Sequence, residues 1–167
     1  VIPRERLTSG RLRYESWLNS LTDADAVERD LFVECPLAHP TWMLRGEAVE
    51  QVGGYRDAGW PEDHDLLLRL RAAGWRLGTV AQVVHEWRDR PERLSRTHPS
   101  YALKAFVRCR AHHLPRLHPR AREGVVVCGA GPVGTTFARA LADVGVPLRA
   151  FIDVDPRKIG QPLPGVP

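Results

Sequence analysis

Three acidic residues gather at one predicted helix start, in the run Trp60-Pro61-Glu62-Asp63-His64-Asp65. Proline favours the first turn of a helix, and the unpaired backbone N–H groups and the helix dipole stabilise acids in that turn. Carboxylates that are held rigidly and kept ionised in this way are able to exchange protons with a substrate. The alternative is that Glu62, Asp63 and Asp65 only cap the helix.

A second motif, Gly129-x-Gly131-x-x-Gly134, directly follows the apolar run 125–128 and precedes a predicted helix. In such a strand–turn–helix setting the first glycine permits a tight turn, the second lets the backbone approach a pyrophosphate, and the third lets the helix pack on the strand. Asp153 ends the next predicted strand, where an acid accepts a hydrogen bond from a ribose hydroxyl. The pattern predicts nucleotide binding, with a structural Rossmann-like half that holds no ligand as the alternative.

The elements that position these residues divide the chain at a proline-containing break. Pro115 and Pro119 are close in sequence, and prolines at this spacing end a helix and stiffen the segment that follows. We therefore predict a first domain over 1–113, a Pro/Arg linker over 114–123 and a second domain over 124–167.

Apolar spacing and capping residues predict an α/β fold, with mostly helices in the first domain and a β-α-β unit in the second. The expected elements of the first domain are helices over 11–20, 23–32, 47–52, 61–73 and 101–113, and one or two short strands over 76–84. The expected elements of the second domain are strands over 124–128 and 148–153, a helix over 135–144, and coil from 156 onward.

Composition indicates a globular chain. Hydrophobic residues make up 43% and charged residues 26% of the 167 residues, and no apolar run reaches the roughly 20 residues of a membrane helix. The three cysteines are far apart and lack a Cys-x-x-Cys pair, which indicates reduced thiols in the cytoplasm rather than a disulfide framework or a zinc site. The start at Val1, without a signal core, indicates the middle of a longer polypeptide.

The net charge of +4 is concentrated in residues 88–122, which hold ten Lys/Arg and two acids. We expect this stretch to be mainly a solvated, arginine-rich helix. Contact with a phosphate or with an anionic membrane surface is the alternative. Nucleic acid is not expected as a partner, because the stretch lacks zinc-finger spacing and interleaved aromatic residues.

Several motifs follow one another between Leu31 and Tyr101. In chain order they are the run 34–45 with His39 and Thr41, Val52-Gly53-Gly54-Tyr55-Arg56, Glu62-Asp63-x-Asp65-Leu66 with Arg69, Ala73-Gly74-Trp75, and Trp87-Arg88 through Ser95. Their order and spacing resemble the acceptor-side, C-terminal half of the family 2 inverting glycosyltransferases, which have a GT-A fold.

This resemblance implies transfer of a sugar from a nucleotide-diphosphate donor to a hydroxyl acceptor with inversion, as in polysaccharide biosynthesis. It implies Asp63 as the general base and Glu62 as a residue that orients the acceptor. At a helix N-terminus Asp63 would have a low pKa, so positioning would contribute much of the rate. The other substrate-binding residues that the resemblance implies are His39, Thr41, Trp60 and Arg88.

The donor half of that family, with its Asp-x-Asp metal motif, precedes the matched region. Here Asp23-Ala24-Asp25 lies ahead of it, at a predicted helix start without a preceding apolar strand, and indicates a helix cap. We therefore expect the isolated chain to be incomplete as an enzyme. A divalent metal, Mg²⁺ or Mn²⁺, would serve the complete enzyme, and the motifs leave its ligands unknown.

The glycine-rich region from Val125 onward resembles the first unit of Rossmann nucleotide-binding domains, especially those that precede sugar-modifying acetyltransferase modules. The resemblance implies NAD or another nucleotide as a ligand of Gly129, Gly131, Gly134 and Asp153. The alternative function of the chain is accordingly a nucleotide- or NAD-binding module with a non-catalytic, helical N-terminal half.

Overall fold

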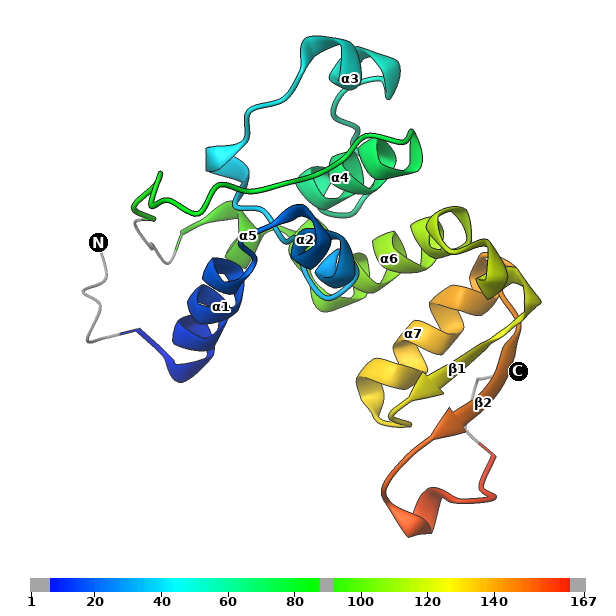
Figure 1. Cartoon of the computed structure of the whole chain (residues 1–167). Coiled ribbons are helices and arrows are strands. Elements are labelled where there is room, and N and C mark those ends of the chain that lie inside the picture. Colours follow the sequence, from blue (N-terminus) through cyan, green and yellow to red (C-terminus); the bar gives the residue numbers. More distant parts are fainter. Residues whose placement is uncertain (1–6, 88–91, 163–167) are drawn as a thin grey trace. The chain divides into compact units, whose positions relative to one another are not determined.

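A computed structural model of the protein describes residues 7–87 and 92–162, which belong to two compact units, unit 1 (1–101) and unit 2 (102–167) (Figure 1). The protein is mixed α/β and mostly helical. The helices of unit 1 are α1 (Ser9–Ser20), α2 (Ala24–Asp30), η2 (His39–Thr41), α3 (Gly46–Gln51), α4 (Glu62–Ala72), α5 (Leu94–Thr97) and η3 (Pro99–Tyr101). The elements of unit 2 are α6 (Leu103–Leu117), η4 (Pro119–Glu123), β1 (Val125–Cys128), α7 (Pro132–Asp143), β2 (Leu148–Ile152) and η5 (Pro156–Lys158).

The first two helices form where capping residues and apolar spacing predict them. The side chain of Thr8 accepts from the backbone N–H of Arg11 at the start of α1, and the side chain of Asp23 accepts from that of Ala26 at the start of α2. The expected cap at Asp23 is thereby confirmed. A small core of Leu21, Ala26 and Val27 lies under these helices, with partly buried Trp17, Leu37 and Leu77 packed against it.

Helix α4 is buried along most of its length, including its one buried arginine. The Arg69 Nε donates to Asp65 Oδ2 (2.7 Å), and the two terminal nitrogens donate to the carbonyl oxygens of Val52 (2.6 Å) and Gly54 (2.7 Å). Gly53 and Gly54 both have positive φ, so the chain turns sharply there and directs these carbonyls toward α4. Arg69 therefore joins α4 to the end of α3.

The strand or strand pair predicted over 76–84 is wrong. Residues 75–87 run as irregular chain with a bend at 81–82, and no described residue pairs with them in a ladder. The segment has the β-branched residues of a strand, but Val80, Val83 and Val84 are exposed. A strand exists only with a hydrogen-bonding neighbour, and within the described chain this segment has none.

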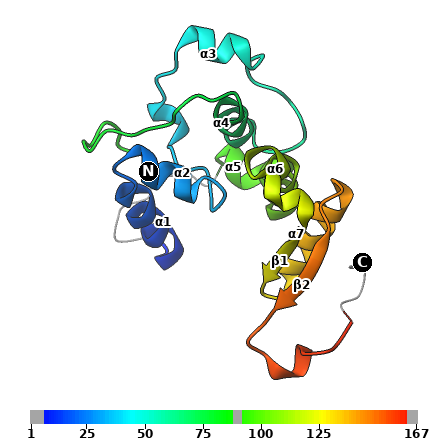
Figure 2. The ribbon, with the colours of Figure 1, turned by 45° about the vertical axis from the view of Figure 1, so that its right-hand side comes forward.

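Unit 2 contains the predicted β-α-β unit. Strands β1 and β2 are parallel, with Val127 beside Phe151 and Cys128 beside Ile152, and α7 lies along one face of this sheet (Figures 1 and 2). The core consists of buried apolar residues from the strands and both helices, with partly buried residues around them. They are Val107, Ala111, Val127, Ala138, Ala140, Leu141 and Val146, and Leu114, Val125, Phe137, Leu148 and Phe151 around them.

Helix α6 differs from the prediction at both the proline break and the domain boundary. It continues through Pro115 to Leu117, and 119–123, within the predicted Pro/Arg linker, form a 3-10 helix. The apolar side of α6, with Val107, Ala111 and Leu114, packs into the core of unit 2. This burial holds the last turn in helical form despite the missing N–H of the proline. The compact units accordingly divide between Tyr101 and Ala102, ahead of α6.

Part of the basic stretch 88–122 lies on α6 and η4, and residues 88–91 lie outside the described chain. The basic side chains on these two helices are Lys104, Arg108, Arg110, Arg116, Arg120 and Arg122. None of the helices in the described chain combines the length and the apolar character needed to cross a membrane.

Replacement of Arg69 by methionine is expected to destabilise unit 1 by about 3–5 kcal/mol, because it leaves the buried Asp65 carboxylate without its ionic partner. The matched control is Arg71→Met, on the same helix. Arg71 pairs with Glu28 near the surface, with side chains 29% and 53% exposed, so its loss should cost at most about 1 kcal/mol. All five tryptophans belong to unit 1, so urea unfolding followed by tryptophan emission measures both values. Equal losses in the two variants would contradict the assigned role of Arg69.

Candidate functional site

The N-terminus of α4 presents two adjacent carboxylates, Glu62 and Asp63. The helix begins directly after Pro61, and Glu62, Asp63 and Asp65 occupy its first turn. The predicted helix start is confirmed. The Asp63 Oδ1 accepts from the backbone N–H of His64 at 2.7 Å, which fixes this carboxylate at the end of the helix.

Asp63 is largely withdrawn from water, since its side chain is 16% exposed. Burial raises the pKa of Asp63 above its ordinary value, the charge of Glu62 adds to the rise, and the His64 N–H and His39 oppose it. The expectation of a low pKa at this helix end is therefore wrong in direction, because desolvation outweighs the backbone hydrogen bonds. A carboxylate with a raised pKa is a stronger base for a hydroxyl proton.

Glu62 is held by a tyrosine from the end of unit 1. The Tyr101 Oη donates to Glu62 and lies 2.7 Å and 2.9 Å from its two carboxylate oxygens. Burial, together with this hydrogen bond, raises the pKa of Tyr101 far above its ordinary value, so the phenol stays protonated and remains a donor. Tyr101 lies 39 residues after Glu62, and no local pattern in the sequence links the two. Sequence reasoning therefore missed Tyr101 as a residue of the site.

His39 lies close to Asp63. Its Nδ1 is 4.0 Å from Asp63 Oδ2, and its Nε2 is 2.7 Å from the Oη of Tyr55. The imidazole also contacts the ring of Trp42, with 4.5 Å between the ring centres. Tyr55 is a second residue that was not assigned to the site, although it belongs to the Gly-Gly-Tyr motif that the sequence analysis singled out. The structure thus brings His39, Tyr55 and Asp63 together.

The other two described substrate-binding candidates make local contacts. The Thr41 hydroxyl donates to the carbonyl oxygen of Ala38 (2.7 Å) in the exposed turn η2. The Trp60 Nε1 donates to Asp65 Oδ1 (3.0 Å), which ties the half-buried indole to α4. Since Asp65 also accepts from Arg69, these contacts give Asp65 and Trp60 a structural role.

Arg88, the remaining residue that the resemblance implies for substrate binding, lies outside the described residues. The residue before it, Trp87, contacts two guanidinium groups. Those of Arg93 and Arg11 lie 4.2 Å and 4.6 Å from its ring centre, within the range of a cation–π interaction.

The three glycines of the motif in unit 2 have different structural roles. Gly129 has φ +97°, a conformation that favours glycine. A methyl group on Gly134 would collide with the carbonyl oxygen of Gly129, so this glycine is required for close packing of α7 on the loop. A methyl group on Gly131 would meet nothing within 4 Å. The same is true of Gly129, so Gly131 is the glycine of the motif that needs neither a positive φ nor the absence of a side chain.

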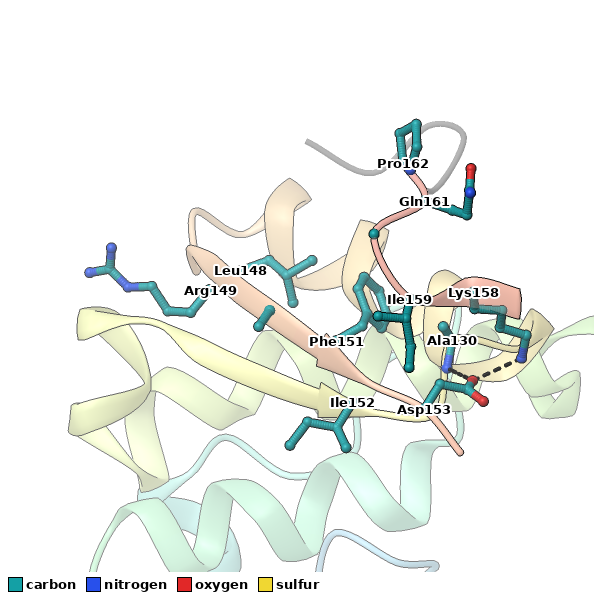
Figure 3. Close-up of a pocket in the computed structure, with 12 residues that line it drawn as sticks. Ala130, Leu148, Arg149, Phe151, Ile152, Asp153, Lys158, Ile159, Gln161 and Pro162 are labelled. Atoms are coloured by element: carbon teal, nitrogen blue, oxygen red, sulfur yellow. Dashed lines mark hydrogen bonds and ion pairs between the residues drawn. The ribbon is translucent and has the colours of Figure 1, made fainter. Parts of the chain in front are cut away.

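The Asp153 carboxylate accepts hydrogen bonds from other residues of unit 2 (Figure 3). Its Oδ2 accepts from the Ala130 N–H (2.7 Å) and from the Lys158 Nζ (2.8 Å), and its Oδ1 accepts from the Asp155 N–H (2.9 Å). Several hydrogen bonds hold the pKa of Asp153 far below its ordinary value, and the one from Lys158 lowers it most. Asp153 therefore fixes the glycine-rich loop through the Ala130 N–H. A ribose hydroxyl would have to donate to the lone pairs of its carboxylate that these contacts leave.

A pocket of about 600 Å³ lies against β2 and this loop, and Asp153 and Lys158 are among its lining residues (Figure 3). Its floor is formed by residues of β2, including Phe151, and Ile159 projects over them. The pocket therefore combines an apolar surface with the Asp153–Lys158 ion pair at one end, and Arg149 lies at the other end (Figure 3).

Replacement of Asp63 by asparagine is expected to stabilise unit 1 at neutral pH. Burial raises the pKa of Asp63 in the folded chain, so the folded state holds a proton that the unfolded state has already released. Stability therefore falls as pH rises through that window and stays lower above it. Asparagine carries no charge and keeps an oxygen for the His64 N–H. The advantage of asparagine in urea midpoint should be clear at pH 7, shrink as pH falls through the raised pKa of Asp63, and be lost below about 4.

The control for this prediction is Asp25→Asn, the same replacement at an exposed position in the first turn of α2. It should show no comparable gain. A gain for Asp63→Asn that is equal at both pH values would contradict the burial argument.

Comparison with family models, with curated proteins and with solved structures finds no match for the chain. The resemblance to family 2 glycosyltransferases and to Rossmann domains therefore remains a hypothesis drawn from the motifs.

Proposed function

We propose that unit 1 carries the acceptor-side, general-base site of an inverting glycosyltransferase. In the proposed reaction an acceptor hydroxyl oxygen attacks the anomeric carbon of a nucleotide-diphosphate sugar, and the bond from that carbon to the diphosphate breaks. Asp63 takes the hydroxyl proton, and the nucleoside diphosphate leaves with the bonding electrons. The observation that supports this most directly is the raised pKa of Asp63 at a fixed position on the end of α4.

The contrast between the two carboxylates supports separate roles for them. Asp63 is desolvated and faces an imidazole, which suits a residue that gains and loses a proton. Glu62 accepts a hydrogen bond from Tyr101, which fixes its orientation. A carboxylate has about four lone-pair sites, so Glu62 keeps capacity to accept from an acceptor hydroxyl and orient it. Tyr101 acts through Glu62 and is a positioning residue.

The donor side of the proposed reaction rests on the motif resemblance. A nucleotide-diphosphate sugar is the proposed donor, and Mg²⁺ or Mn²⁺ the proposed counter-ion of its diphosphate, with ligands that stay unassigned. Activity is proposed for the chain together with a donor-binding part, and a cytoplasmic location belongs to the same proposal. Contact of the basic stretch 88–122 with an anionic membrane surface is a further proposed interaction.

Replacement of Asp63 by asparagine should lower kcat for sugar transfer by roughly 10²–10⁴, the usual contribution of a general base, with little change in KM. Asparagine preserves shape and the His64 contact but does not take up the proton. The measurement is nucleoside diphosphate release from UDP-glucose and dTDP-glucose with octyl glucoside as acceptor, for this chain and for any longer polypeptide that contains it.

Asp25→Asn is again the control, because Asp25 lies at the exposed start of another helix. It should leave kcat unchanged. Turnover within a few-fold of wild type for Asp63→Asn would rule out Asp63 as the base.

Nucleotide binding by unit 2 is a second candidate function, favoured by the open side of Gly131 and the neighbouring pocket with Lys158. The backbone N–H groups at the start of α7 and the Lys158 ammonium are groups that bind phosphates. NAD and a nucleotide sugar are the two proposed ligands. The Ala130 N–H and the Lys158 ammonium, which both donate to Asp153, would lie close to such a ligand.

Gly131→Val should weaken binding of NAD or UDP-glucose at least about tenfold, or roughly 1.4 kcal/mol, without loss of stability. The φ and ψ of Gly131 (−86° and −176°) suit a β-branched residue, so the added side chain only blocks the loop. Gly134→Ala is the contrasting variant, since it should unfold unit 2 through the clash with Gly129. Calorimetric titration and thermal unfolding separate the two effects. Equal affinities of wild type and Gly131→Val would speak against this site.

A further inference from the structure

In the proposed reaction Asp63 takes up one proton in each catalytic cycle, and the groups that face its two oxygens determine how that proton is released. After each transfer Asp63 holds a proton and must lose it before the next cycle, yet its side chain is only 16% exposed. Its Oδ1 faces the His64 N–H, which is a donor and does not accept a proton. Oδ2 faces the imidazole of His39.

His39 and Tyr55 extend from Asp63 toward water. The His39 Nδ1 lies 4.0 Å from Asp63 Oδ2, and its Nε2 lies 2.7 Å from the Tyr55 Oη. Exposure increases along this row, from 16% for the Asp63 side chain to 38% for that of His39 and 50% for Tyr55. The three groups thus form a row from a partly buried carboxylate to an exposed tyrosine.

The neighbouring segments hold the imidazole in this orientation. Its ring contacts the rings of Trp42 and Tyr55, with 4.5 Å and 5.5 Å between ring centres. Trp42 is itself fixed, because its Nε1 donates to the Leu37 carbonyl oxygen. Tyr55 follows directly after Gly54, whose carbonyl accepts from Arg69.

The other titratable groups near Asp63 are less suited to carry its proton outward. The negative charge of Asp63 raises the pKa of Tyr14 and of Tyr101, and the charge of Glu62 raises the pKa of Asp63. Tyr101 donates to Glu62. Tyr14 is partly buried, and burial, with help from Cys35 and Glu34, raises its pKa to about 12.

We propose that His39 and Tyr55 form a proton relay that returns Asp63 to its carboxylate form after each sugar transfer. This role rests on the proposed function of Asp63 as the base. The proton on Asp63 Oδ2 passes to His39 Nδ1, the proton on Nε2 passes to Tyr55 Oη, and the original phenolic proton passes to water. Asp63 ends as a carboxylate, while His39 and Tyr55 end neutral. Exchange of the imidazole protons with water then restores the starting tautomer.

The distance from His39 to Asp63 is long for a direct hydrogen bond, whereas that from His39 to Tyr55 is ideal for one. Catalytic hydrogen bonds are often long in a free enzyme and shorten in the complex with substrate. The two facing atoms, His39 Nδ1 and Asp63 Oδ2, lie within ion-pair distance in the structure.

The first test is chemical rescue of the transfer reaction described above. His39→Ala should lower kcat by about tenfold or more, with KM nearly unchanged, and imidazole added to the solution should restore much of the rate. Tyr55→Phe should lower kcat in dilute buffer and recover it in concentrated buffer. The control is His85→Gln, an exposed histidine outside the row, which should behave as wild type.

A folded His39→Ala variant with unchanged kcat, or with a loss that imidazole does not restore, would overturn the relay and leave Asp63 as the base intact. Thermal unfolding of each variant identifies a loss that comes only from stability.

The second test needs no turnover and therefore separates the relay from the proposed function. The Asp63 carboxyl is titrated by carbon-13 NMR in wild type and in His39→Gln. His39 lowers the pKa of Asp63, so its removal should raise that pKa, whereas His85→Gln should not. An unchanged Asp63 titration would show that the two groups are uncoupled and would overturn the relay, whether or not the chain transfers sugars.

Discussion

The buried ion pair of Asp65 and Arg69 is the interaction on which the arrangement of unit 1 depends. Taking both charges out of water is unfavourable unless further hydrogen bonds satisfy the remaining groups. Arg69 obtains them from the carbonyls of Val52 and Gly54, and Asp65 obtains one from the Trp60 indole. Both ends of the loop between α3 and α4 are thereby held against α4, whose first turn carries Glu62 and Asp63.

This fastening has a chemical consequence, because Tyr55 lies inside the same loop. Its contact with His39 brings a third segment to Asp63, while Tyr101 closes on Glu62 from the end of the unit. The burial that results has opposite effects on chemistry and on stability. It makes Asp63 a stronger base, and at neutral pH it makes the folded state less stable than a neutral side chain would. Such a conflict is common at sites that have a function.

How far the sequence predicts this structure depends on the range of each interaction. The cap at Asp23, the start of α4 and the β1-α7-β2 unit follow from short patterns, because caps, periodicity and glycine turns act within a few residues. The approach of Tyr101 to Glu62 and the desolvation of Asp63 depend on residues far away in the chain, which short patterns do not contain. For the same reason the 76–84 strand failed, since its apolar residues required a partner, and α6 passed Pro115 because its packing outweighed a local rule.

Gly131 stands apart from the other glycines of its loop. Gly129 needs its positive φ and Gly134 has no space for a side chain, so folding alone requires both. At Gly131 the backbone has φ −86° and the space beside it is open. Glycine at such a position gives the unfolded chain more conformational entropy than alanine would, and this lowers stability by about 0.4–1 kcal/mol. The folding of unit 2 gives no reason for a glycine there, so a larger residue at this one position of the loop is compatible with the fold.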